Sequence, residues 1–115
     1  MSAEAVEIAE ADVAAVFEWL NSGEIILVDV RETDEYAREH IPGSVLSPLS
    51  MFDADVFPAF PGKRIVFACA VGKRSAAAAK QLVKTGYGSV VNMTGGLLAW
   101  KEAGFGTEVT QTSPA

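Results

Sequence analysis

The fold of this chain is decided by the stretch Ile65-Val66-Phe67-Ala68-Cys69-Ala70-Val71-Gly72-Lys73-Arg74-Ser75-Ala76-Ala77-Ala78-Ala79. Its first four residues form an apolar run typical of a buried strand, and its last four form a strong helix-forming segment. Cys69, the only cysteine of the chain, therefore stands where a strand ends and a helix is about to begin. Backbone N–H groups and the positive end of a helix stabilise an anion at such a place, which favours a thiolate nucleophile.

Strands and helices alternate on both sides of this stretch. Runs of apolar and β-branched residues predict strands at residues 6–8, 25–30, 44–47, 64–68 and 89–93. Apolar residues at helical spacing predict helices at residues 13–20, 34–39, 75–85 and 97–103, with residues 48–60 irregular or weakly helical. The alternation predicts an α/β domain with a small, mostly parallel five-stranded sheet and helices on both faces.

Local signals predict how these elements begin and end. Thr33 and Ser75 are expected to N-cap the second and third helices through their hydroxyl groups. Gly95-Gly96 is expected to form a tight turn, which explains a glycine pair better than a phosphate site does. Residues 1–106 are expected to form one domain, and the polar residues 107–115 a mobile C-terminal tail.

Composition excludes several classes of protein. Half of the 115 residues are hydrophobic, which suffices for a core without metals or crosslinks. One cysteine cannot form an internal disulfide, and with one histidine it cannot form a Cys/His zinc site. A net charge of −6 without a cluster of Lys and Arg argues against a nucleic-acid partner. We therefore expect no metal, no cofactor and no nucleic acid.

The chain also lacks signals for a membrane or for export. No apolar run approaches the roughly 18 residues that suggest a membrane span. The N-terminus has neither the basic residues nor the apolar segment of a signal peptide, and a free thiol suits a reducing compartment. The expected location is therefore the cytoplasm, without membrane attachment.

The residues from Cys69 to Ser75 are the candidate active site. The alternative is a buried structural cysteine, but the glycine, the two cations and the following helix favour a functional thiol. If the backbone amides of the loop converge, they form a site for an anion. The candidate substrate-binding residues are Ala70, Val71, Gly72, Lys73, Arg74 and Ser75. Lys73 and Arg74 could neutralise a charged substrate, although Lys73 is almost as well explained as a solvated surface cation.

Four segments carry a family resemblance. Cys69-x-x-Gly72-x-Arg74-Ser75 resembles the active-site loop of the rhodanese family of sulfurtransferases. The other three segments resemble further parts of that family in the same order: Leu27-Val28-Asp29-Val30-Arg31-Glu32 with Glu35-Tyr36, His40-Ile41-Pro42-Gly43-Ser44, and Asn92-Met93-Thr94-Gly95-Gly96-Leu97-Leu98-Ala99-Trp100. The loop alone is a moderate signal, and four segments in order are a strong one.

The resemblance implies a specific chemistry and a rhodanese-like fold. The Cys69 thiolate would take the outer sulfur of a donor such as thiosulfate or a persulfide, and pass it to cyanide or a thiol. Thioredoxin or a sulfur-carrier protein is a further candidate acceptor, since the chain has no second cysteine. Related phosphatases have one more residue between cysteine and arginine and usually a histidine before the cysteine. The shorter spacing here, with Ala68 before Cys69, favours sulfur transfer.

Four polar or aromatic residues near the candidate site are interpreted as structural. Asp29 and Arg31 leave a predicted buried strand and are expected to fix the loop that follows it. His40 is expected to stabilise a turn, and Trp100 to pack in the core close to the site. One alternative function stays open: a non-catalytic binding or redox-sensing module on the same fold, although the intact cysteine weighs against it.

Overall fold

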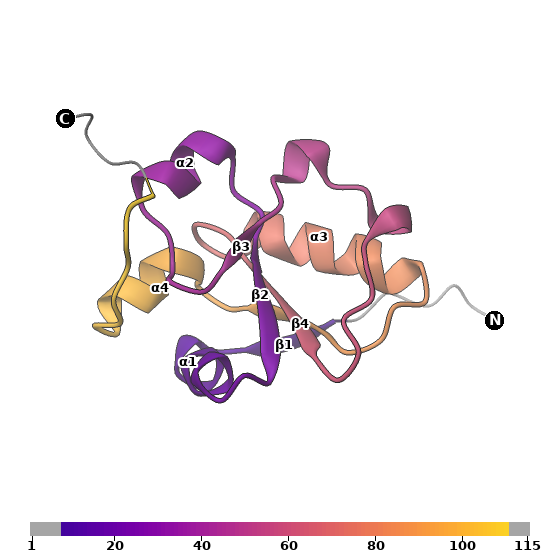
Figure 1. Cartoon of the computed structure of the whole chain (residues 1–115), viewed down its shortest axis with the longest axis horizontal. Helices are drawn as coiled ribbons and strands as arrows, with labels where there is room; N and C mark the ends of the chain where they lie inside the picture. The colour runs from indigo at the N-terminus through magenta and orange to yellow at the C-terminus, as the bar shows by residue number, and fades with distance from the viewer. Residues whose placement is uncertain (1–7, 111–115) are drawn as a thin grey trace.

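The protein folds around one five-stranded parallel sheet (Figure 1). The computed structural model describes residues 8–110. The strands run in the order β1-β5-β4-β2-β3, and every neighbouring pair is parallel. Their bounds are β1 (Ala9–Ala11), β2 (Ile25–Asp29), β3 (Val45–Leu46), β4 (Arg64–Ala68) and β5 (Val90–Met93). The predicted α/β class with a five-stranded sheet is confirmed.

Helices cover both faces of the sheet. Their bounds are α1 (Val13–Asn21), α2 (Thr33–Arg38), α3 (Lys73–Lys84) and α4 (Gly96–Glu102), with short 3-10 helices η1 (Leu49–Met51) and η2 (Ala54–Val56). In Figure 1, α1 and α4 lie on one side of the strands, and α3 and the two 3-10 helices lie on the other. A parallel sheet with both faces covered needs strands that are apolar on both faces, as β2 and β4 are.

The central strand β4 divides the core into two clusters. Successive side chains of a strand point to opposite faces, so Val66 and Ala68 pack with Val16 and Trp100 beneath α1 and α4. Phe67 packs on the other face, where Ala78, Ala79 and Leu82 of α3 meet it. Cys69 belongs to this second cluster, so the residue that directly follows β4 lies beneath α3.

Two local predictions need correction. The first strand covers Ala9–Ala11 rather than residues 6–8; Val6 and Glu7 lie outside the described residues. Glu32, not Thr33, is the N-cap of α2, because Glu32 and Glu35 form a reciprocal capping box and the Glu35 carboxylate accepts from the Glu32 amide at 2.9 Å. The N-cap therefore lies one position before Thr33, the residue whose hydroxyl was expected to cap the helix.

The segment after α4 lies along α2. Thr107 Oγ1 donates to Glu39 Oε2 at 2.7 Å, and the Glu108 amide donates to the carbonyl of His40 at 2.8 Å. Residues 107–110, expected to begin a mobile tail, are thus hydrogen-bonded to the domain. Residues 111–115 lie outside the described part of the chain.

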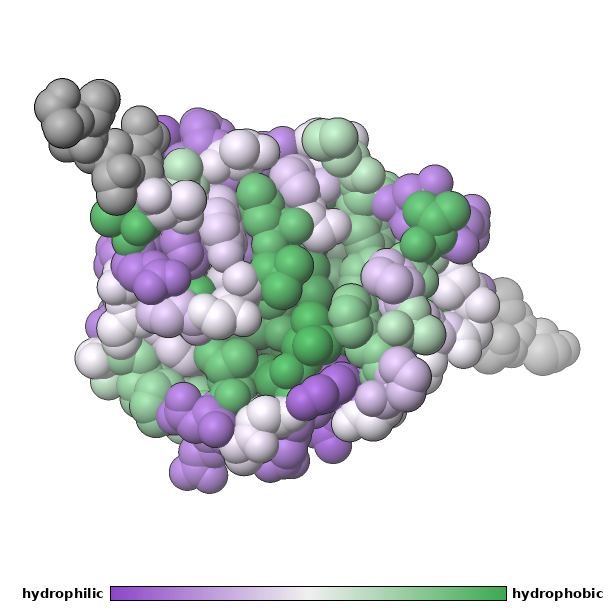
Figure 2. All heavy atoms as spheres, in the orientation of Figure 1, coloured by the Kyte–Doolittle hydropathy of each residue, from purple (hydrophilic) through white to green (hydrophobic). Residues whose placement is uncertain are grey.

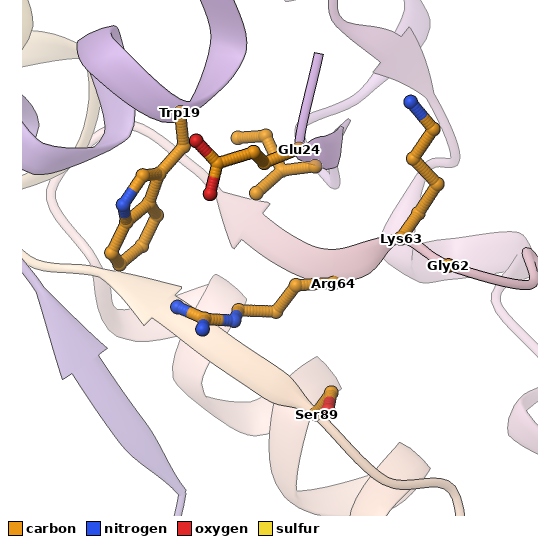
Figure 3. A pocket seen from close by; sticks show the side chains of 7 residues that line it. Trp19, Glu24, Gly62, Lys63, Arg64 and Ser89 are labelled. Atoms are coloured by element: carbon orange, nitrogen blue, oxygen red, sulfur yellow. The ribbon is translucent and has the colours of Figure 1, made fainter. Parts of the chain in front are cut away.

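The surface carries an apolar band and, at another place, a polar hollow. Figure 2 shows hydrophobic residues gathered over β3 and the neighbouring edge of β2, where Val45 is half exposed. The hollow, of about 380 Å³, lies at the amino ends of the strands (Figure 3). Its cations are engaged within the protein: Lys63 Nζ donates to the Gly23 carbonyl, and the Arg64 guanidinium lies 4.6 Å from the ring centroid of Trp19. Cys69 lies at the opposite, carboxyl edge of the sheet.

None of the described helices is long and apolar enough to cross a membrane.

Candidate active site

Cys69 is placed by the end of β4 and the start of α3. Its side chain is 1% exposed, directly after the last strand residue, Ala68. Gly72 is the N-cap of α3 and has a φ of +99°, a left-handed conformation that favours glycine. The chain therefore turns within the short loop 69–72 and enters a helix whose first amides lie close to the sulfur.

Donor groups surround the Cys69 sulfur. The Gly72 amide donates to Sγ at 3.1 Å, and the Ser75 hydroxyl donates to it at 3.3 Å. Burial raises the pKa of the Cys69 thiol, but hydrogen bonds from the Ser75 hydroxyl and from the amides of Ser75, Gly72 and Val71 outweigh it. The pKa of the thiol therefore lies below its ordinary value, and the thiolate is favoured.

Ser75 has a different role from the predicted one. It was expected to N-cap the third helix, but α3 begins at Lys73, so Ser75 is its third residue and is fully buried. Its hydroxyl is directed at Cys69 Sγ instead of at a helix amide. The correction moves Ser75 from the helix end to the immediate surroundings of the thiol.

Arg74 is paired with a carboxylate of α2. Its Nη1 and Nη2 contact Glu35 Oε1 and Oε2 at 2.9 and 3.1 Å, a bidentate ion pair. Hydrogen bonding to Arg74 lowers the pKa of Glu35 to about 2, and the same contact raises the pKa of Arg74. This contact ties the first turn of α3 to α2, and the role of Arg74 toward a charged substrate stays a prediction.

Sequence reasoning did not select Glu35 as a site residue. The partner of Arg74 lies 39 positions earlier in the chain, beyond the reach of any local pattern. A signal was present, because Glu35-Tyr36 stands inside one of the four segments that resemble the family.

The other loop residues are open to solvent to different degrees. The Lys73 side chain is exposed and makes no hydrogen bond or ion pair within residues 8–110. Val71 is half exposed, and Ala70 is partly buried. Lys73 is therefore the loop cation that is available to a ligand.

Asp29 and Arg31 support the backbone beside the candidate site. Both are 5% exposed, and the Arg31 guanidinium contacts both carboxylate oxygens of Asp29, the shortest distance being 2.8 Å. Arg31 Nη2 also donates to the Glu39 carbonyl at 2.6 Å, which fixes the end of α2. Asp29 pairs with Ala68 in the sheet, next to Cys69. This buried pair favours the structural interpretation of both residues.

The side chains of His40 and Trp100 make their hydrogen bonds and ring contacts with residues other than Cys69. The His40 ring stacks on Tyr36 with a centroid distance of 3.9 Å, and its Nε2 lies 3.0 Å from Glu108 Oε2. Trp100 packs in the core beneath α1 and donates to the Gly106 carbonyl at 2.9 Å. Trp100 thus belongs to the core cluster on one face of the sheet, and Cys69 belongs to the cluster on the other.

The start of α4, with Gly95 as its N-cap and Gly96 as its first residue, is hydrogen-bonded to the loop that carries Cys69. The amide of Leu97 donates to the Cys69 carbonyl at 2.8 Å, and that of Leu98 to the Ala70 carbonyl at 3.1 Å. A Cβ on Gly96 would lie 2.5 Å from the Cys69 carbonyl oxygen, and Gly96 has a φ of +62°. The pair was expected to form only a turn; it also permits the close approach of α4 to the loop.

No three His, Cys, Asp or Glu side chains come together as metal ligands within the described residues.

The protein is thus a parallel α/β domain in which a loop at the carboxyl edge of the sheet lowers the pKa of a cysteine thiol. The Rhodanese-like domain family matches residues 12–103, so the chain belongs to the rhodanese family. An uncharacterised protein of Synechocystis is 41% identical to it over 90 residues, which are 78% of this chain and 50% of that protein. This chain thus spans about half the length of that relative.

Two further proteins place the chain within this family. Thiosulfate sulfurtransferase GlpE of Pseudoalteromonas translucida is 33% identical over 92 residues, which are 79% of this chain and 87% of that protein. The crystal structure of a rhodanese-like domain protein from Staphylococcus aureus has a TM-score of 0.76 at 27% identity, covering 90% of this chain and 100% of that one. Sulfurtransferase is the general class that the named relatives support.

Proposed function

We propose that this domain is a sulfurtransferase that carries a sulfane sulfur as a persulfide on Cys69. The observation that carries the proposal is the set of donors around Sγ: the Gly72 amide at 3.1 Å and the Ser75 hydroxyl at 3.3 Å. A thiolate held by such donors is an activated nucleophile, and sulfur attack at a sulfur atom needs no dedicated acid or base. The named sulfurtransferase among the relatives supports the same class.

The proposed reaction has two halves. The Cys69 thiolate attacks the outer sulfur of thiosulfate; the Sγ–S bond forms, the S–S bond of the donor breaks, and sulfite leaves with the electron pair. The persulfide is an anion, and the donors that hold the thiolate also stabilise it. Cyanide or an incoming thiolate then takes the outer sulfur, giving thiocyanate or a new persulfide, and the Cys69 thiolate returns as leaving group.

The two loop cations have different proposed roles. Arg74 is held by Glu35 and shapes the loop, whereas Lys73 is exposed and is the side chain that we assign to attracting an anionic donor. A persulfide donor would use the same loop. The acceptor comes from outside the chain, because no second cysteine is present to release the sulfur as a disulfide. Cyanide, a small thiol, thioredoxin and a sulfur-carrier protein all fit this requirement.

The test uses intact mass and product formation. Incubation with thiosulfate should add the mass of one sulfur atom to the protein, and cyanide should remove it as thiocyanate. The matched control is Cys69→Ser, which keeps the size of the side chain and should show neither event. Absence of both events in the parent protein, or their persistence in Cys69→Ser, would refute the proposal. A partner protein that binds Cys69→Ser as tightly as the parent, without any turnover, would instead support a binding module.

A further inference from the structure

Gly72 connects Cys69 to the neighbouring strand β5. Its amide donates to Cys69 Sγ at 3.1 Å, and its carbonyl accepts a hydrogen bond from Asn92 Nδ2 at 3.3 Å. The two peptide groups flank one Cα atom that has no side chain, so rotation at Gly72 is restrained mainly by its contacts. The hydrogen bond from Asn92 therefore helps to determine the orientation of the Gly72 amide, which faces the Cys69 sulfur.

The orientation of the Asn92 amide is determined by its partners. Besides the Gly72 carbonyl, Nδ2 contacts the Glu10 carboxylate at 3.0 Å, and both partners are acceptors. Nδ2 therefore uses both of its hydrogens, and the two ends of the amide cannot be exchanged without losing both contacts. Glu10 and Asn92 are neighbours across the β1–β5 pair, which explains how the carboxylate reaches this buried position.

The position of the Asn92 side chain leaves one of its polar atoms buried without a hydrogen bond in the described part of the chain, which lowers the stability of the fold. Asn92 is 4% exposed, and its Oδ1 is buried without a hydrogen-bond partner among the described residues. A buried acceptor left unpaired lowers stability, so an apolar side chain of similar size would suit the stability of the core better. Because the Asn92 side chain does not stabilise the core, its presence there requires an explanation other than stability.

We propose that Asn92 is a positioning residue for Cys69: by holding the Gly72 carbonyl, it keeps the Gly72 amide directed at the sulfur. Asn92 does not touch the sulfur or a substrate, and it acts only through Gly72. The inference rests on the proposed function for its purpose in sulfur transfer. Its test reads the reactivity of the thiol alone, so it can fail or succeed whether or not the domain transfers sulfur.

The test is the pH profile of alkylation of Cys69 by iodoacetamide. Asn92→Leu keeps the approximate size of the side chain and removes the donor. We expect the thiol pKa to rise by about half to one unit, and the rate below that pKa to fall roughly three- to tenfold, because one hydrogen bond to the thiolate is weakened. Urea unfolding should show that the variant stays folded, because removal of the unpaired Oδ1 offsets the loss of the two Nδ2 hydrogen bonds. A folded Asn92→Leu with an unchanged thiol pKa would overturn the proposal.

A control and a measurement on the parent complete the test. Thr94 Oγ1 donates to the same Glu10 oxygen at 3.0 Å but makes no hydrogen bond to Gly72 within residues 8–110, so Thr94→Val should leave the thiol pKa unchanged. An equal rise in Thr94→Val would also overturn the proposal. If Asn92→Leu does not fold, NMR of the parent decides: the side-chain NH₂ signals of Asn92 should shift with pH at the midpoint of the thiol, and signals that do not shift there contradict the inference.

Discussion

The ion pair between Glu35 and Arg74 makes a quantitative prediction about stability. Replacing Glu35 by Gln removes the charge but keeps the shape and an oxygen that can accept from the Glu32 amide. A carboxyl whose pKa falls from 4.5 to about 2 would gain roughly 3 kcal/mol on folding. Water reaches both side chains, which are 28% and 36% exposed, and its screening reduces the expected loss in Glu35→Gln to about 1–2 kcal/mol at pH 7.

The sign of the pH dependence follows from the lowered pKa. Because the folded-state pKa of Glu35 lies below its unfolded value, the stabilisation is complete above about pH 4.5 and is lost as the pH falls toward 2. Urea unfolding of the parent and Glu35→Gln, repeated from pH 7 to pH 3, should show a gap in free energy that narrows at the acid end. Equal stability at pH 7, or a gap that stays constant down to pH 3, would contradict the reasoning.

A matched control distinguishes this pair from an ordinary surface contact. Asp34 and Arg38 of the same helix lie 3.3 Å apart, but their side chains are 70% and 69% exposed. Exposed pairs of this kind contribute little, so Asp34→Asn should leave the free energy of unfolding within experimental error at every pH. A loss in Asp34→Asn as large as in Glu35→Gln would mean that the charge of α2, and not its contact with α3, determines stability.

Two further predictions concern the loop. Ser75→Ala removes the hydroxyl 3.3 Å from Sγ, so the thiol pKa should rise and the alkylation profile should move to higher pH; an unmoved profile would mean that the backbone amides suffice. Gly96→Ala places a Cβ 2.5 Å from the Cys69 carbonyl oxygen and should reduce the free energy of unfolding by about 2 kcal/mol or more. Gly104→Ala, at a similar φ of +87° but with open space around it, should cost clearly less in the same urea titration.

The strands and the reactive loop were predictable because their signals are local. The apolar run 64–68 is β4 with the predicted ends, and the run 25–30 contains β2. Both strands are buried on two faces, which gives continuous rather than alternating hydrophobicity. Cys69 was identified because the glycine, the cations and the helix former that mark its loop follow it directly in the chain.

The helix starts and the partners of the loop were not predictable in the same way. A hydroxyl before a helix-forming run is a good local cap, but the left-handed Gly72 lets α3 begin before Ser75 and turns that hydroxyl toward the sulfur. Glu35 and Gly96 act on the loop from distant parts of the chain, one as a counter-ion and one through the space that it leaves empty. Contacts of this kind depend on tertiary structure, which single-residue preferences do not contain.

The strand order has a consequence for biosynthesis. β1 pairs only with β5, and the carbonyls of Cys69 and Ala70 receive their hydrogen bonds from Leu97 and Leu98. As the chain leaves the ribosome, β2, β3 and β4 can pair early, whereas the first strand, β1, can pair only after the last strand, β5, has emerged. The hydrogen bonds from Leu97 and Leu98 to the loop that carries Cys69 can form only after α4 has emerged. A nascent chain that stalls before residue 96 therefore carries the cysteine in a loop without these two hydrogen bonds, and the carboxyl end of the sheet around Cys69 is the last part to be completed.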